Sequence, residues 1–338
     1  MNKHHGKGSL ACLLGLAALL GVSCIYYGGC ETMVRFEKEV ALSAPLAPGL
    51  SFTAETRDGA IAVEGVDAAE CRVMATITTR ARTIEQAEEL ADRIEVKLES
   101  SGSGVVFIMN GPIITRHSRY DVSLAVQVPA QTSLALVTRD GNIHAGDIVG
   151  RVEARATDGN IGIESLEGDV KLETIDGNIA CAGVKADELD LHTTDGRVEL
   201  TDIVARTCRA RTSDGRITVT RVQADEANLR TTDGSIRCHE INVARMDCRT
   251  TDGSVHLEYA PEAPKALHVR AVTSDGHITL IAPPELSAAV QAQTNEGSID
   301  TSLPITVQGK VGKSLGGTVG GGEGMVYLRA RDGSITIR

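Results

Sequence analysis

Aspartate recurs at a regular interval along this sequence of 338 residues, and a column of carboxylates is a ligand set that Ca²⁺ prefers. The motif Thr-x-Asp-Gly-x-Ile and its close variants occur eleven times, and from Asp140 to Asp252 the Asp residues of consecutive copies are 18 or 19 residues apart. If the copies stack, their carboxylates form a column. The candidate ligands in it are Asp176, Asp195, Asp214, Asp233 and Asp252.

Two roles are open for these carboxylates. An Asp that precedes Gly accepts hydrogen bonds from the amides of its own turn, which is a structural role and requires no ion. Like charges about 5 Å apart in water repel each other by only about 0.8 kcal/mol, so a stacked column is stable without a counterion. We therefore expect turn capping and no cofactor, with a calcium column as the alternative.

The repeat also aligns arginines on one outward row, at Arg211, Arg230 and Arg249. A cationic strip on a chain of net charge −11 would attract an anionic polysaccharide, a lipid head group or an acidic partner. Acidic residues on the same and the adjacent row would neutralise the strip as cross-strand pairs, and this is the role we favour. The further basic residues of these rows are Arg155, Arg209 and Arg270, and the acidic ones are Glu153, Glu173, Asp190 and Asp247.

Apolar side chains mark the strands that position these residues. Three residues after each Asp (Glu296 in one copy) stands Ile or Val, four residues before it stands Ala, Leu or Cys, and polar residues alternate with them. Alternation of period two on both sides of a Gly turn predicts two short strands per copy. Such strands bury too little surface alone, so the copies must stack as coils of an all-β parallel β-solenoid, about 4.8 Å apart. Crossover statistics favour right-handed winding.

The turn residues carry two further predictions. Nine of the eleven copies have Thr two residues before the Asp, and alternation places its side chain inward, where stacked hydroxyls can bond to one another. An outward array of hydroxyls that binds a flat ligand is the alternative. The Gly that follows the Asp is expected to adopt a positive φ.

Eight cysteines would suggest disulfides in an exported protein, but their positions predict neither a disulfide framework nor a metal site. Three lie near the N-terminus, no Cys-x-x-Cys occurs, and four fall at inward positions of the repeat, where Cys acts as a small apolar residue. These four are Cys181, Cys208, Cys238 and Cys248.

Two segments interrupt the repeat. One contains a predicted helix at Thr83–Glu95, with Thr83 and Gln86 placed as a capping box, between predicted strands. We expect this insert to be a small α+β cap that covers the open end of the first coil. The other, the Gly-rich stretch 309–324, is predicted to be a flexible loop before the last coil. The predicted organisation is a signal or anchor segment at 1–30, a linker and first coil at 31–66, the cap at 67–130 and the solenoid at 131–338.

The N-terminus has the features of an export signal. Two lysines precede an apolar run at 9–27. The sequence Leu-Gly-Val-Ser-Cys that ends at Cys24 resembles a lipobox, whose Cys is lipidated after cleavage, and Cys30 is the alternative. An uncleaved membrane anchor and a soluble exported form are also open, because the run is about 18 residues long. Each of these options places the folded part in the cell envelope or at the cell surface.

Composition and motifs exclude several classes of function. A net charge of −11 and an aromatic content of 2% argue against binding to nucleic acid, which relies on basic surfaces and aromatic stacking. The sequence has no HExxH, and the Gly-Lys-Ser at 312–314 lacks the earlier Gly of a P-loop. We therefore expect no enzymatic activity. A polysaccharide-cleaving β-helix enzyme is the alternative, and its cleft would have to lie at the irregular coils 258–268, 281–290 and 300–325.

The Thr-x-Asp-Gly-x-Ile coils resemble the bacterial "putative adhesin" family, a domain of otherwise unknown function, and are similar to the autotransporter-adhesin-head domain. The resemblance spans residues 50–338, including the helical insert and the Gly-rich stretch. It implies an exported or surface-attached β-helix-like protein and transfers no catalytic residue. We therefore expect a non-catalytic, adhesin-like envelope protein for surface binding or spacing. Its expected partner is a cell-surface glycan or an envelope protein, with membrane attachment through the N-terminal segment.

Overall fold

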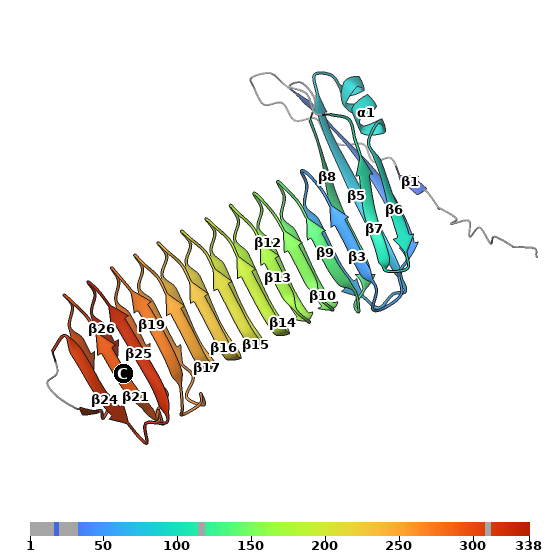
Figure 1. Ribbon diagram of the computed structural model, residues 1–338. Helices are drawn as coiled ribbons and strands as arrows, with labels where there is room; N and C mark the ends of the chain where they lie inside the picture. Colours follow the sequence, from blue (N-terminus) through green and yellow to red (C-terminus); the bar gives the residue numbers. More distant parts are fainter. Residues whose placement is uncertain (1–16, 20–32, 114–118, 308–311) are drawn as a thin grey trace, which may run out of the picture.

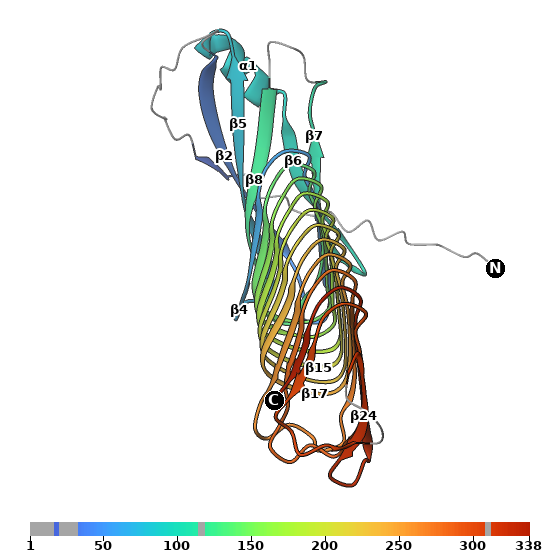
Figure 2. The same ribbon diagram turned by 90° about the vertical axis from the view of Figure 1, so that its left-hand side faces the viewer.

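The computed structural model describes residues 17–19, 33–113, 119–307 and 312–338. It shows an elongated molecule in which a stack of β-coils begins beside a cap that carries the helix (Figure 1). The predicted parallel β-solenoid is confirmed, because strands of successive coils pair parallel. When the molecule is viewed nearly along the stack, the coils superpose one behind another (Figure 2).

Each coil has two sides, which we name by their position relative to the Asp-Gly turn. The post-turn side contains β4 (Ile61–Val66), β10 (Ile143–Val149), β12 (Ile161–Glu167), β18 (Val255–Tyr259), β20 (Ile278–Ile281), β22 (Ile299–Thr301) and β26 (Ile335–Ile337). The pre-turn side contains β3 (Ser51–Glu55), β9 (Ser133–Val137), β11 (Val152–Arg155), β13 (Val170–Glu173), β19 (His268–Thr273), β21 (Ala288–Gln293) and β25 (Gly324–Ala330). Four long strands run through both sides: β14 (Ile179–His192), β15 (Val198–Arg211), β16 (Ile217–Arg230) and β17 (Ile236–Arg249).

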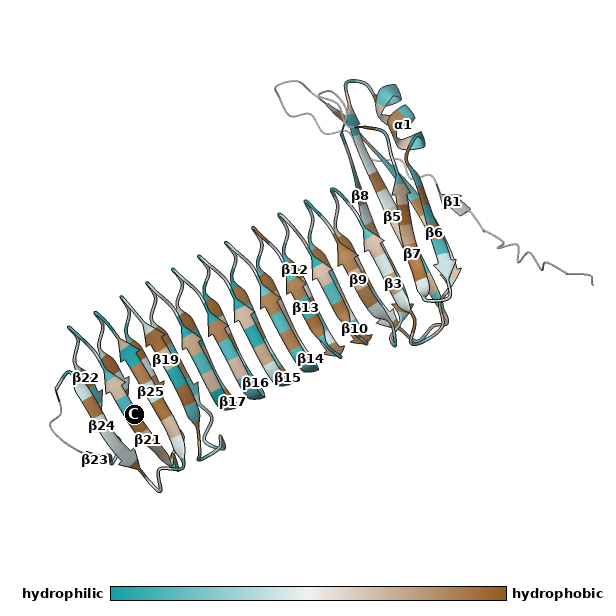
Figure 3. Cartoon of the chain, viewed as in Figure 1, coloured by the Kyte–Doolittle hydropathy of each residue, from teal (hydrophilic) through white to brown (hydrophobic). Residues whose placement is uncertain are grey.

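The apolar columns stack in the register that the spacing predicts. Ile161 is the register partner of Ile143 and of Ile179, and Val198 and Ile217 follow on the next two strands. All five side chains are at most 1% exposed. Apolar and polar residues alternate along the strands (Figure 3), so each coil has a buried and a solvated row. The resulting core is continuous from Val40 to Ile337.

The coils bend at a second position that we did not predict. Seven residues after the turn Asp, the residue adopts the left-handed conformation, which redirects the chain at a single position and lets pairing continue on both sides. For this reason β14, β15, β16 and β17 each span 14 residues, where two short strands were expected. The φ values at these corners are 57° at Asp147, 51° at Ser165, 64° at Gly183, 56° at Asp202, 52° at Arg221 and 53° at Glu240.

Close approach explains the turn glycines, and the expected positive φ is wrong for all of them except Gly59. A Cβ placed on Gly215 would lie 1.7 Å from the carbonyl oxygen of Gly196 in the neighbouring coil. A Cβ placed on Gly234 would lie 1.7 Å from the carbonyl oxygen of Gly215. No side chain fits between two turns stacked this closely, so Gly is required by packing against the next coil.

The turn threonines are buried, as predicted, but their hydroxyls have a different partner. Thr212 donates to the carbonyl oxygen of Gly196 at 2.9 Å, and Thr231 donates to that of Gly215 at 2.9 Å. Among the described residues, the expected Thr–Thr bond occurs between Thr56 and Thr138, at 3.1 Å. Each hydroxyl therefore links its own coil to the turn of the coil before it.

The cap extends both sides of the first coil away from the stack. On the post-turn side, β8 (Arg119–Pro129) pairs with β4, and β5 (Glu70–Ala81) and β2 (Val34–Pro45) follow in order. On the pre-turn side, β7 (Gly104–Asn110) pairs with β3, and β6 (Glu95–Ser101) pairs with β7. Helix α1 (Ile84–Asp92) lies against β2 and β5. A short strand, β1 (Ala17–Leu19), pairs antiparallel with β2.

The helix begins where the capping box predicts. The Thr83 hydroxyl accepts a hydrogen bond from the Gln86 amide at 3.3 Å, which satisfies one free N–H of the first turn. The helix ends at Asp92 and not at the predicted Glu95, because Arg93 is its C-cap and Glu95 already begins β6.

At the C-terminal end, the order of the coils differs from their order in the sequence. β25 and β26 pair with β19 and β20 on one side and with β21 and β22 on the other, so the last coil of the chain lies inside the stack. β24 (Ser314–Val319) pairs antiparallel with the outer β21, and β23 (Thr306–Val307) pairs with β24. The prediction of a loop at 309–324 is therefore wrong for 314–319, where the chain forms an edge strand.

Candidate functional site

The turn aspartates lie on successive turns along one edge of the stack. The turns are held in place by backbone bonds, such as that from the Asp214 amide to the Thr194 carbonyl of the neighbouring coil at 3.1 Å. Desolvation raises the pKa of Asp195, and the neighbouring carboxylates of Asp176 and Asp214 add to the effect. These carboxylates are thus close enough to influence each other's protonation.

The calcium column stays a prediction. Its five members, Asp176 to Asp252, occupy neighbouring turns, so the structure brings them into one row. Within the ranges that the structure describes, no three His, Cys, Asp or Glu side chains are grouped so that they could hold a metal ion. The amide expected to be capped by Asp is bonded to Thr instead: the Gly215 N–H donates to the Thr212 hydroxyl at 3.2 Å.

The predicted interior cysteines are buried in the core. Burial raises the pKa of the Cys208 thiol to about 12 and that of Cys71 also to about 12. These thiols stay protonated at neutral pH, and protonated buried thiols are poor nucleophiles. The free cysteines of the described chain are Cys71, Cys181, Cys208, Cys238 and Cys248, and all are buried.

Arginines converge on the outer surface of the pre-turn side. Arg211, Arg230 and Arg249 are register partners on the neighbouring strands β15, β16 and β17. The adjacent row contributes Arg209 on β15. In the same row, Arg270 on β19 is the register partner of Asp247 on β17. The structure therefore brings together the strip that the spacing predicts.

The last coil adds two residues to this surface that the sequence did not suggest. β25 lies beside β19, so Arg329 is the register partner of Val272 and Tyr327 is that of Arg270. The Arg270 guanidinium lies 5.3 Å from the centre of the Tyr327 ring, which is a cation–π contact. We name the arginine face as Arg209, Arg211, Arg230, Arg249, Arg270 and Arg329.

Acidic residues neutralise this surface only in part. Asp247 accepts two hydrogen bonds from Arg249, at 2.9 and 2.6 Å, and lies 4.0 Å from Arg230. Farther along the row, Arg155 pairs with Glu153 and, at 3.0 Å, with Glu173. The predicted neutralisation is thus present at Arg155 and Arg249. In the described structure Arg209, Arg211 and Arg329 make no ion pair, so they leave uncompensated charge on the face.

In the irregular coils, as far as the structure describes them, the charged residues form separate contacts. Lys265 forms an ion pair with Glu285, which lowers the pKa of that carboxyl. The Lys313 ammonium donates to the carbonyl oxygens of Glu296 and Gly297, both at 2.8 Å. Glu258 lies on β18 and contacts His239 at 2.5 Å. Each group contacts a different partner.

The predicted lipidation residues, Cys24 and Cys30, lie outside the described residues. The described part of the predicted signal segment is β1, whose residues pair with Glu39, Val40 and Ala41 of β2. No helix in the described part of the chain is both long and apolar enough to cross a membrane.

This chain is similar in fold to two crystal structures. That of a "putative adhesin" from Parabacteroides distasonis has 12% sequence identity and a TM-score of 0.50, covering 71% of this chain and 96% of the other. That of a "putative adhesin" from Parabacteroides merdae has 13% identity and a TM-score of 0.49, covering 71% and 95%. A search of curated proteins found no match.

A family model described as Toastrack DUF4097 matches residues 53–338, from the first coil through the cap to the last strand. This match confirms the resemblance that the coils suggested. The chain belongs to the Toastrack DUF4097 family.

Proposed function

We propose that this chain is a non-catalytic, exported protein of the cell envelope that binds an anionic polymer of the cell surface through its arginine face. The observation that carries the proposal is the alignment of Arg211, Arg230 and Arg249 on adjacent strands of one rigid sheet. The crystal structure from Parabacteroides distasonis that shares the fold is named a "putative adhesin", and a role in attachment agrees with that name.

The chemistry of the face suits carboxylate, sulfate or phosphate groups. A guanidinium presents a planar fork of donors that pairs with an oxyanion through two hydrogen bonds. Arg211 has no ion pair to lose when it binds, whereas Arg249 would have to share Asp247 with the ligand. We therefore expect Arg211 to contribute most.

The stack determines the kind of polymer. Strands about 4.8 Å apart offer one guanidinium per coil along the axis of the solenoid. A linear polyanion that lies along this axis contacts several coils at once, and each further contact forms at a high effective concentration. We therefore favour an acidic surface polysaccharide over a single small anion, with an acidic envelope protein as the other partner of this chemistry.

Lipidation at Cys24, or at Cys30, would hold the solenoid at a membrane. Cys30 precedes β2 by only a few residues. An acyl chain at Cys30 would place the cap next to the bilayer and leave the arginine face accessible. Mass spectrometry of the exported chain tests this: an acylated N-terminal Cys is expected, and an intact N-terminus would favour the uncleaved anchor.

The arginine face is tested by calorimetric titration of residues 31–338, which contain the continuous core from Val40 to Ile337, with polygalacturonate, a linear polyuronate. Substituting Arg211, Arg230 and Arg249 together by Ser is expected to weaken binding at least tenfold, about 1.4 kcal/mol. The matched control replaces three exposed arginines outside the face, Arg197, Arg216 and Arg237, by Ser.

Both triple variants lose the same charge, so a non-specific electrostatic effect would weaken them equally. Equal weakening, or no binding by the unsubstituted chain, would contradict the proposal. Binding should also weaken with added salt, because ion pairs at an exposed surface are screened. Assaying the same mixtures for new reducing ends tests the alternative of a polysaccharide-cleaving enzyme.

A further inference from the structure

A groove of about 750 Å³ lies on the outer surface of the post-turn side, where the cap joins the solenoid. It crosses β2, β5, β8, β4, β10 and β12, which are neighbours in one continuous sheet. We name it the junction groove. Its lining contains no residue of the arginine face, which is on the pre-turn side, so the two surfaces are independent.

The floor of the junction groove is a row of apolar side chains, three Ala and one Met. Ala41, Met74, Ala125 and Ala62 are successive register partners on β2, β5, β8 and β4. The row is about 14 Å long, because it spans three strand spacings of roughly 4.8 Å. Met74 is 37% exposed, although large apolar side chains of this chain are mostly buried. A straight aliphatic chain would cover this row.

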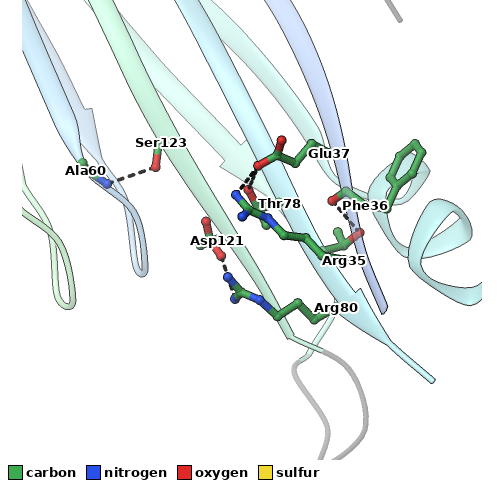
Figure 4. A network of polar contacts seen from close by, with 9 residues as sticks. Arg35, Phe36, Glu37, Ala60, Thr78, Arg80, Asp121 and Ser123 are labelled. Atoms are coloured by element: carbon green, nitrogen blue, oxygen red, sulfur yellow. Dashed lines mark hydrogen bonds and ion pairs between the residues drawn. The ribbon is translucent and has the colours of Figure 1, made fainter. Parts of the chain in front are cut away.

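Polar residues border the row on both sides. On one side the next outward row is Glu39, Thr76 and Ser123, in register. Beyond that row, Thr78 donates to Glu37, Glu37 pairs with Arg35, and Arg80 pairs with Asp121 at 3.2 Å (Figure 4). The other border is the next outward row of the sheet. It consists of Ser43, Arg72, Gln127 and Glu64, in register.

The solenoid end of this border is acidic and has a gap. Gly146 is the register partner of Glu64 on one side and of Glu164 on the other, so two carboxylates flank a position without a side chain. Asp147 follows in the lining, and the described structure shows no ion pair for these three acids. Of the basic residues in the lining, Arg72 is already paired with Glu70 at 2.5 Å, and the Nε2 of His144 lies 3.9 Å from the position of a Cβ on Gly146. The gap above Gly146 therefore suits a small cationic group.

We propose that the junction groove binds a ligand that joins an aliphatic chain to an ammonium group. The chain lies on the row from Ala41 to Ala62, and the ammonium group lies above Gly146, between Glu64 and Glu164. Both halves are needed: the floor offers the ligand no hydrogen-bonding side chain, and the carboxylates alone are exposed to water, where a single ion pair is weak.

The test is a calorimetric titration of residues 31–338 with dodecylamine below its critical micelle concentration, at pH 7, where a primary amine is protonated. Saturable binding with one site is expected. Dodecanoate has the same chain length and the opposite charge, and butylamine has the ammonium group without the long chain. Both are expected to bind at least tenfold more weakly.

Variants locate the site. Ala125→Trp fills the floor and is expected to abolish binding, whereas Ala180→Trp, on the same outward row but beyond the groove, is expected to leave it unchanged. The double substitution Glu64→Gln and Glu164→Gln is expected to weaken dodecylamine at least tenfold, and Glu199→Gln should have no effect. Circular dichroism melting of each variant verifies that it is folded.

Three results would overturn the proposal: equal binding of dodecylamine and dodecanoate, no saturable binding of either, or equal effects of the two Trp variants. If Ala125→Trp does not fold, the double Gln variant decides by itself. The polygalacturonate titration of the Ala125→Trp chain distinguishes the two surfaces, because the arginine face should still bind when the groove is filled.

Discussion

Side-chain bonds from one coil to the next hold the turns of this protein in register. The Thr hydroxyl and the turn Gly carbonyl form one such ladder, with 2.8 Å between Thr250 and Gly234. Asn side chains form a second ladder, since the backbone N–H of Asn178 donates to the side-chain Oδ1 of Asn160 at 2.8 Å. The Thr bond satisfies a polar group whose burial would otherwise be costly, whereas the Asn bond lies at the exposed surface. The same residues therefore recur from coil to coil because they contact the neighbouring coil.

Replacing a turn glycine tests this explanation at the scale of one residue. Gly215→Ala places a Cβ 1.7 Å from a backbone oxygen that has no freedom to move, and we expect a loss of about 3 kcal/mol in the free energy of unfolding. The measurement is the midpoint of urea unfolding. Gly102→Ala is the control, since nothing lies within 4 Å of its Cβ and a change within about 0.5 kcal/mol is expected. Equal effects of the two would mean that close approach does not explain the turn.

At the scale of the strand, the corner residues decide how a coil closes. A left-handed residue costs little for Gly, Asn or Asp and more for a β-branched residue, whose Cβ substituents clash with the backbone. Ser165 is such a corner, at a φ of 51°, and its side chain is exposed. The corner conformation therefore disfavours a β-branched side chain.

We expect Ser165→Val to lower the free energy of unfolding by roughly 1–2 kcal/mol, and Ser165→Asn to leave it within about 0.5 kcal/mol. Thermal and urea unfolding of both variants measure the difference. Both variants replace the same exposed Ser, so lost packing contributes nothing to the comparison. A Val variant as stable as the Asn variant would show that the corner tolerates any residue.

The predictability of the elements follows from the same physics. The stacking of Ile161 on Ile179 was predictable, because a constant spacing between copies of the motif places equivalent residues of neighbouring coils in register. The corner escaped prediction because Ser, Gly, Asp, Arg and Glu occupy it, and no single residue type marks it. The strip at Arg211 was predictable from spacing, whereas Arg329 was not, because the last coil enters the stack out of sequence order. The junction groove depends on pairing between β2, β5 and β8, which no repeat encodes.

At the scale of the whole molecule, the exchange of the last two coils closes the stack. An ordinary solenoid would end on the last coil of the chain and leave a full edge open to another chain. Here the last coil is held between two others, and the outer edge consists of the short strands β22, β23 and β24. Short edges offer few unpaired groups, so the arrangement protects the molecule from end-to-end association.

This arrangement gives the C-terminal coil an effect out of proportion to its length. Deleting residues 324–338 removes the strands that join β19 and β20 to β21 and β22, so the chain beyond Ile281 loses its place in the stack. We expect limited proteolysis to cleave the truncated chain between residues 282 and 323, and to leave the full chain intact there.

Deleting an inner coil is the matched comparison. Without residues 196–214 the Asp195 turn continues directly into the next copy of the motif, and the flanking coils have the same inward columns to pair with each other. Although this deletion is longer, we expect the shortened stack to remain resistant to protease and to melt as one unit. A truncated chain as resistant as the one with the inner deletion would mean that β21 can pair directly with β19. The order of strands in the structure would then have no role in closing the stack.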